Sequence, residues 1–167
     1  RSENINKQSQ NNPEGSFYKI NGIASSTSKD WHGTEMSLPA LKEMKEQFDK
    51  GVPYLPTHSD NEWNDVIGKT EGAEIYRDNT LENQNDEEEG YSLRVNVLLY
   101  KEEEIAEKLY KRVKRGEKVG MSIGGWFKEI DVIENEDGDI ERVIVNDLQL
   151  DHLATTRNPS NPDSYIS

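Results

Sequence analysis

The stretch EKVGMSIGGWFKEI, residues 117–130, decides between two fold classes for this chain. Its GMSIG run, residues 120–124, fits the G-x-S-x-G pattern of a hydrolase nucleophile elbow, where a strand turns sharply into a helix. Here two glycines and the β-rich run WFKEIDVIE follow Ser122, which predicts a continuing strand instead. Only 45 residues follow the serine, too few for the rest of an α/β-hydrolase. We therefore exclude that fold and keep Ser122 as a candidate nucleophile.

The neighbouring segments predict a mainly β protein. Two strands are expected over residues 118–133 and 140–156, joined by an Asp-Gly hairpin signal. Further extended segments are expected at residues 17–25, 52–58, 65–78 and 91–100. Two helices interrupt the strands, so the order indicates an α+β fold. It favours a closed or nearly closed β-barrel surrounded by helices over a doubly wound sheet.

Both helices have recognisable signals. The first, residues 37–51, has Ser37 as its N-cap, Pro39 in its first turn and Gly51 as its stop. The second, residues 101–116, gathers basic residues at its carboxyl end, where they suit the helix dipole. The stripes predicted to face the core are Leu41, Met44 and Phe48 in the first helix, and Ile105, Leu109 and Val113 in the second.

Length and charge set the organisation and limit the partners. Residues 1–15 are polar and predict a disordered arm, and residues 16–167 predict a single domain. The net charge is −13, with acidic stretches at 82–90 and 134–141 that are typical of solvated loops. This balance argues against nucleic acid as a partner, since phosphate binding depends on basic surface.

Two absences narrow the chemistry further. The sequence has no cysteine, which excludes a thiol nucleophile, disulfides and a cysteine metal site. It has no apolar run long enough to cross a bilayer and no signal peptide at its polar start, so we expect an intracellular protein with no membrane partner. Because the chain begins with Arg1, it is consistent with a processed fragment.

Ser122 and two histidines form the candidate catalytic set. Gly120, Ser122 and Gly124 share one face of the predicted strand, which would let a substrate backbone approach the serine hydroxyl. The alternative is that the glycines only shape a bend or bulge. His58 ends an extended run and could act as general base, although a surface loop histidine fits the same pattern.

The last strand offers Asp151 and His152 as rival third members. Alternation places His152 on the inward face with Leu150 and Ala154, and Asp151 on the polar face. We therefore expect His152 to contribute and Asp151→Asn to change turnover little. A satisfied core histidine is the alternative.

A metal reading stays open but lacks the spacing of a dedicated site. His58 and Asp60 could join His152 or His32 around a cation, yet no H-x-x-x-H or paired-carboxylate motif is present. We therefore predict no metal and no cofactor, and a structural role for His32.

Four segments in order resemble the prohead, or capsid maturation, proteases of tailed phages, which are relatives of the herpesvirus assemblin proteases. They are DWHGTEMSLPALKEMKEQF, VPYLPTHSDNEWNDVIGKTEGAE, VGMSIGGWF and LDHLATTRNPSNPDSYI, spanning residues 16–166. The resemblance implies Ser122 as nucleophile, His58 as general base and His152 as third member. Many phage relatives have a glutamate at the position of His152, so here the triad resembles the Ser-His-His type of the herpesvirus branch.

The resemblance also implies a fold, substrates and a location. The implied fold is an assemblin-like β-barrel with surrounding helices, with Arg157 as a candidate oxyanion-hole residue. The implied substrates are the phage scaffold, the extension of the major capsid protein and the protease itself, inside the immature prohead in the host bacterial cytoplasm. Herpesvirus relatives act as dimers, so a homodimer is possible. The alternatives are a non-catalytic β-barrel binding or assembly module and a catalytically silent family member.

Overall fold

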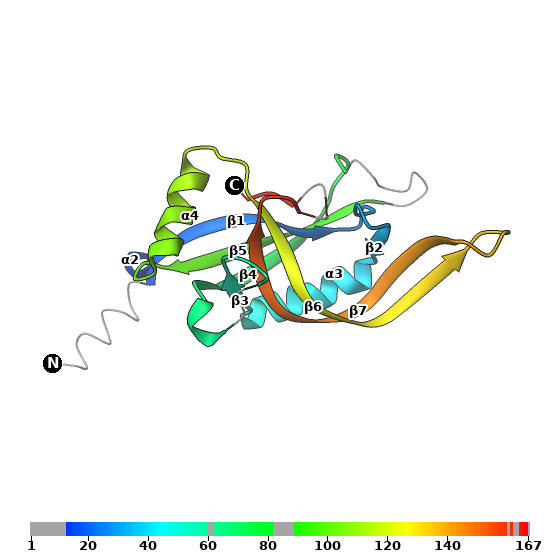
Figure 1. The fold of residues 1–167 in the computed structure, drawn as a ribbon, viewed down its shortest axis with the longest axis horizontal. Coiled ribbons are helices and arrows are strands. Elements are labelled where there is room, and N and C mark those ends of the chain that lie inside the picture. The colour runs from blue at the N-terminus through cyan, green and yellow to red at the C-terminus, as the bar shows by residue number, and fades with distance from the viewer. Residues whose placement is uncertain (1–12, 60–61, 82–88, 160, 162–163, 167) are drawn as a thin grey trace.

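The computed structural model describes residues 13–59, 62–81, 89–159, 161 and 164–166 (Figure 1). Most of the predicted arm and of the acidic loop at 82–90 lies outside these ranges. The end of the arm is described, and Pro13–Ser16 form the short helix α2. None of the described helices has the length and apolar character needed to cross a bilayer.

Seven strands form one sheet around the long strand β7, Ile140–Thr156 (Figure 1). The remaining strands are β1 Phe17–Ser26, β2 Thr34–Met36, β3 Pro53–Leu55, β4 Gly68–Arg77, β5 Tyr91–Tyr100 and β6 Gly120–Glu134. The order β1-β5-β4-β3-β7-β2 runs along one path, and β6 pairs antiparallel with β7 off this path. Two short strands, β2 and β3, run parallel to β7 at different points of its length. β7 therefore pairs with three other strands, β2, β3 and β6.

The predicted β-barrel is only half formed. The sheet curls through 201°, which makes a half-barrel, and no ladder between β1 and β6 closes it among the described residues. The segment 164–166 lies between these strands, with Ile23 N donating to Tyr165 O at 3.2 Å and Met121 N donating to Ser164 O at 3.0 Å. Ile166 N donates to Val119 O at 2.8 Å. The last described residues thus bridge β1 and β6.

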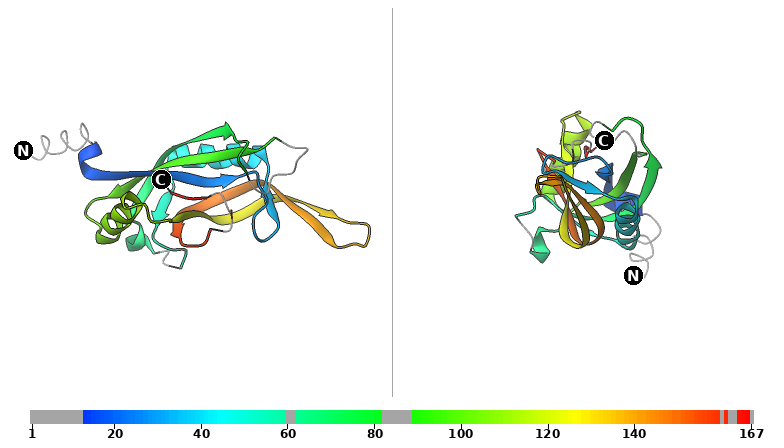
Figure 2. Two further views of the ribbon diagram at one scale, coloured as in Figure 1. Left: turned by 90° about the horizontal axis from the view of Figure 1, so that it is seen from above. Right: turned by 90° about the vertical axis from the view of Figure 1, so that its right-hand side faces the viewer.

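Helix α3, Leu38–Lys50, packs against β4, β5 and β7 (Figure 2). The predicted signals are confirmed: the Ser37 hydroxyl accepts from Ala40 N at 3.2 Å, and Gly51 ends the helix with φ of +106°. Leu41, Met44 and Phe48 are fully buried, as their spacing predicted. Their burial joins the helix to the core of the half-barrel.

Helix α4, Glu104–Lys114, buries most of the predicted stripe. Leu109 is buried and Val113 packs partly buried against the core, but Ile105 is 53% exposed and Ala106 is fully buried instead. The helix packs on β1 and β5, where the Tyr18 and Tyr110 rings stack with centroids 4.5 Å apart. The prediction is thus wrong at Ile105, in the first turn of the helix.

The short strand β2 was not predicted from sequence. Its central residue Glu35 is 6% exposed, and its carboxylate accepts from Arg142 Nε at 2.8 Å and from Arg142 Nη2 at 2.9 Å. Such bidentate pairs fix geometry as well as charge. This pair joins β2 to the beginning of β7, close to the turn between β6 and β7.

A 3-10 turn, Trp63–Asp65, lies between β3 and β4.

We predict that Gly68→Ala destabilises the fold by about 1–3 kcal/mol, the range typical of overpacking. Gly68 pairs with Tyr54 on β3 and Leu99 on β5, and an added Cβ would lie 2.3 Å from Leu98 O, a backbone atom. Gly72→Ala on the same strand is the control, because its Cβ would meet only Asp49 Oδ1 at 3.6 Å. Denaturant unfolding measures both, and equal unfolding free energies would contradict the prediction.

Candidate active site

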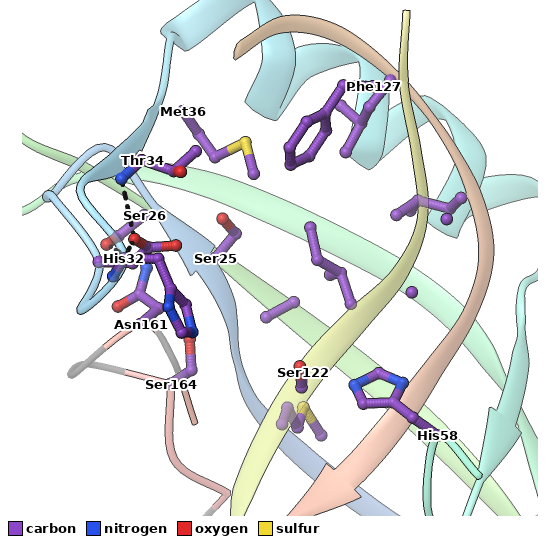
Figure 3. A pocket seen from close by; sticks show the side chains of 18 of the residues that line it. Ser25, Ser26, His32, Thr34, Met36, His58, Ser122, Phe127, Asn161 and Ser164 are labelled. Atoms are coloured by element: carbon purple, nitrogen blue, oxygen red, sulfur yellow. Dashed lines mark hydrogen bonds between the residues drawn. The ribbon is translucent and has the colours of Figure 1, made fainter. Parts of the chain in front are cut away.

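A cavity of about 480 Å³ runs along the inner side of β6 (Figure 3). Ser122 and His58 both line it, together with polar residues of the β1 end and apolar residues of β6 and β7. The apolar part includes Met36, Phe127 and Leu148. The cavity therefore joins a candidate nucleophile and a candidate base to a space that could hold a peptide side chain.

Strand pairing places Ser122 opposite the end of β3. Ser122 on β6 pairs with Ala154 on β7, and Ala154 pairs in turn with Leu55 on β3. The three residues form a row across the sheet, and His58 follows Leu55 after three residues. This is why segments 64 residues apart in sequence meet at one cavity wall.

His58 and His152 contact each other directly. His58 Nδ1 lies 2.6 Å from His152 Nε2, and the two ring centroids are 4.8 Å apart with the planes inclined by 59°. His152 is buried on the inward face of β7, as alternation predicted, whereas His58 is exposed as a residue. The hydrogen bond leaves Nε2 of His58 as the ring nitrogen not engaged by His152.

The ring of His152 lies directly over Gly124. These two residues pair across β6 and β7, and a Cβ on Gly124 would come within 2.3 Å of His152 Nε2 and Cε1. Any larger residue would push the imidazole out of this position. The glycine therefore positions the imidazole that contacts His58.

Asp151 also reaches His152. Its Oδ2 lies 2.8 Å from His152 Nδ1, although the two residues are adjacent on a strand and point to opposite faces. The Asp151 side chain is 46% exposed and that of His152 is 9% exposed. The carboxylate therefore contacts the ring nitrogen that faces away from His58.

Burial and charge affect the titration of His58. Desolvation of the ring, and the positive charge of a protonated His152 beside it, both lower the pKa of His58 from its ordinary value of 6.5. A lowered pKa keeps the imidazole neutral at neutral pH. That is the form a general base requires.

A comparison with models of known protein families identifies the family of this chain. A family model described as caudovirus prohead serine protease matches residues 8–167. The chain belongs to that family. Searches of curated proteins and of solved structures return no significant match. Membership in the prohead protease family implies a serine protease with capsid-related substrates in the phage procapsid.

The remaining predicted residues lie in different surroundings. A Cβ on Gly120 would lie 2.8 Å from Pro159 Cγ and from Ser164 O, so the protein fills the space beside this glycine. Gly124 lines the cavity of Ser122 and also faces the His152 ring. Arg157 is exposed and lines a second cavity with Pro56 and Thr155, not the cavity of Ser122.

His32 lies in the same cavity as Ser122, although the sequence predicted only a structural role. Figure 3 shows it near Ser26 and Asn161, away from Ser122 and His58. The backbone N–H of His32 donates to Asp30 Oδ1 at 2.9 Å, a contact within the loop that fits the structural role predicted for His32. Asp60, named in the metal reading, lies outside the described ranges, and the described residues contain no group of three or more potential ligands arranged for a metal.

Sequence reasoning missed two features of the site. The Asp151–His152 bond was discarded because alternation separates neighbouring side chains, yet a carboxylate is long enough to fold back. The second is the lining by Asn161 and Ser164 from the segment after β7. Ser164 is fully buried and its hydroxyl has no hydrogen-bond partner in the described structure. For the Asp151–His152 bond, the available signal in the sequence was the adjacency of the two residues in LDHL.

We predict that Gly124→Ala lowers proteolytic turnover by about 100-fold, the typical cost of misplacing a catalytic group by about 1 Å. The added methyl would displace the His152 ring from His58 while leaving the strand paired. Gly72→Ala is the matched control, since Gly72 lies outside the cavity. Turnover of a cleavable peptide and the melting temperature should be measured together. Unchanged turnover in Gly124→Ala would contradict the role assigned to this ring contact.

We predict that activity falls on the acid side with a midpoint below pH 6.5. Protonation of His58 would remove the lone pair that a general base needs, and the lowered pKa of His58 moves this loss to more acidic pH. The pH dependence of kcat/KM for a peptide substrate reports this limb for the free enzyme. A midpoint clearly above 6.5 would mean that another group controls the base.

Proposed function

We propose that the chain is the serine endopeptidase of prohead maturation, with Ser122 as nucleophile, His58 as general base and His152 as third member. The observation that supports it most is the 2.6 Å contact of His58 Nδ1 with His152 Nε2 in the cavity wall that also holds Ser122. The proposed substrates are the scaffold, the capsid-protein extension and the protease itself, inside the immature prohead of an infected bacterium.

The proposed reaction follows the logic of serine proteases. Ser122 Oγ attacks the scissile carbonyl carbon while its proton passes to His58 Nε2. The tetrahedral intermediate then breaks its C–N bond, and His58 returns the proton to the leaving amine. Water repeats the sequence on the acyl-enzyme, which releases the acid product and restores Ser122. His152 Nε2 holds the Nδ1 side of His58 throughout.

The polar and apolar parts of the cavity support a peptide substrate. Buried hydroxyls of Ser25, Ser26 and Ser28 lie at the β1 side, and the side chains of Phe127 and Leu150 lie at the other. The cavity therefore offers hydrogen-bonding groups on one side and apolar surface on the other, a combination that suits a peptide with its polar backbone and apolar side chains. We propose no catalytic role for Arg157, because it lines the second cavity.

We predict that a fluorophosphonate labels Ser122 and that Ser122→Ala removes both labelling and cleavage. Loss of a serine nucleophile costs on the order of a millionfold in turnover. His58→Ala should cost a similar factor because base and nucleophile act as one unit, and His152→Ala about 10- to 1,000-fold because an orienting group does not itself react. His32→Ala is the matched control, and it should retain most activity.

The decisive assay is incubation with the cognate scaffold and major capsid protein, followed by mass spectrometry of the fragments. Fragments from the wild type but not from Ser122→Ala support the proposal. Cleavage by Ser122→Ala would overturn it. Absence of both labelling and cleavage in folded wild-type protein would favour the silent family member or the binding module.

A further inference from the structure

Asp151 and His152 form an unusual contact for two neighbours on one strand. The Asp151 carboxylate lies 2.8 Å from His152 Nδ1, and the opposite nitrogen of the same ring lies 2.6 Å from His58 Nδ1. Three side chains are thus joined in a line from the protein surface to the cavity. The exposed end is a carboxylate, and a pair with an exposed carboxylate adds little to folding stability. The main consequence of the Asp151–His152 contact is therefore which ring nitrogens carry protons.

The chemistry of the two contacts fixes those positions. An ionised carboxylate only accepts hydrogen bonds, so His152 must donate from Nδ1. A neutral imidazole has one donor and one acceptor nitrogen, so His152 Nε2 then accepts. His58 must in turn donate from Nδ1 to that acceptor. The remaining nitrogen of His58, Nε2, is left with its lone pair.

The opposite arrangement would disable the base. If His152 carried its proton on Nε2, it would donate to His58 Nδ1, and the proton of His58 would move to Nε2. A protonated Nε2 cannot accept the proton of Ser122. The difference between a working and a blocked His58 therefore depends on which nitrogen of His152 is protonated.

We propose that Asp151 is a positioning residue that fixes the tautomers of His152 and His58, leaving a lone pair on His58 Nε2. This inference rests on the proposed function of Ser122 and His58. It replaces the expectation from strand alternation that the carboxylate has no part in the site. The rigid support comes from the buried ring over Gly124, and the proton placement comes from Asp151.

Three variants separate proton placement from general disturbance. Asp151→Ala removes the acceptor, and Asp151→Asn keeps an acceptor oxygen without the charge. Asp147→Ala is the matched control, because Asp147 also points to the polar face of β7 and forms an ion pair with Lys128 Nζ, at 3.7 Å, instead of a contact with a histidine. The control should label at the wild-type rate.

The first readout is the fluorophosphonate labelling rate. We expect Asp151→Ala to lower it by about 10- to 100-fold, the cost typical of removing a group that orients a functional histidine. Asp151→Asn should lose less than the alanine variant, because the amide oxygen can still accept from Nδ1. We therefore expect a small effect of Asp151→Asn on the labelling rate and a larger effect of Asp151→Ala.

The second readout does not depend on activity. Nitrogen NMR of the imidazoles in a Ser122→Ala background, at a pH where both rings are neutral, reports which nitrogen carries each proton. With Asp151 present we expect the proton on Nδ1 of both His58 and His152. With Asp151→Ala we expect a mixture of tautomers in both rings, and no change with Asp147→Ala.

The outcomes distinguish this inference from the proposed function. Unchanged tautomers in folded Asp151→Ala would overturn the inference, as would wild-type labelling by that variant. Absence of labelling in the wild type would overturn the function while the NMR result still tests the role of Asp151. If Asp151→Ala does not fold, the NMR of Ser122→Ala with Asp151 present decides, since a proton on Nε2 of either ring would contradict the inference directly.

Discussion

The structure depends on the pairing of β7 along both of its edges. One edge receives β6, which carries Ser122, and the other receives β2 and β3, of which β3 delivers His58. The strand itself contributes His152 from between them. A shift of one residue in either register would turn the paired side chains to the opposite face. Strand register thus fixes Ser122 and His152, and the turn that follows β3 carries His58.

The close contacts of backbone and ring explain why small residues occur where they do. Gly124 leaves space for the His152 ring, and Gly68 lets β4 approach the backbone of β5. Neither position needs a positive φ, so the requirement is for space. The glycines flanking Ser122 were expected to leave room for a substrate. A Cβ at Gly120 would meet Pro159 and Ser164, whereas Gly124 makes space for the His152 ring and also lines the cavity of Ser122.

Much of the fold was predictable because local signals and tertiary packing agree. The α3 caps, the buried positions Leu41, Met44 and Phe48, and the inward face of β7 follow from spacing alone. The exposure of Ile105 in α4 did not, because Ala106 of the same turn is the residue that meets the core. The three-residue strand β2 and the half-open sheet depend on long-range contacts that no local pattern encodes. At the site, the residue types were predictable, but the line of contacts from Asp151 to His58 required coordinates.

The bridging segment 164–166 has a consequence for the behaviour of the protein in solution. Edge strands present unpaired N–H and C=O groups that can pair with another chain, and this segment covers part of the facing edges of β1 and β6. It does so through backbone hydrogen bonds to Ile23, Val119 and Met121. A chain shortened before Ser164 would therefore be prone to edge-to-edge association, which sedimentation would detect. Colloidal stability and the wall of the cavity are thus maintained by the same few residues.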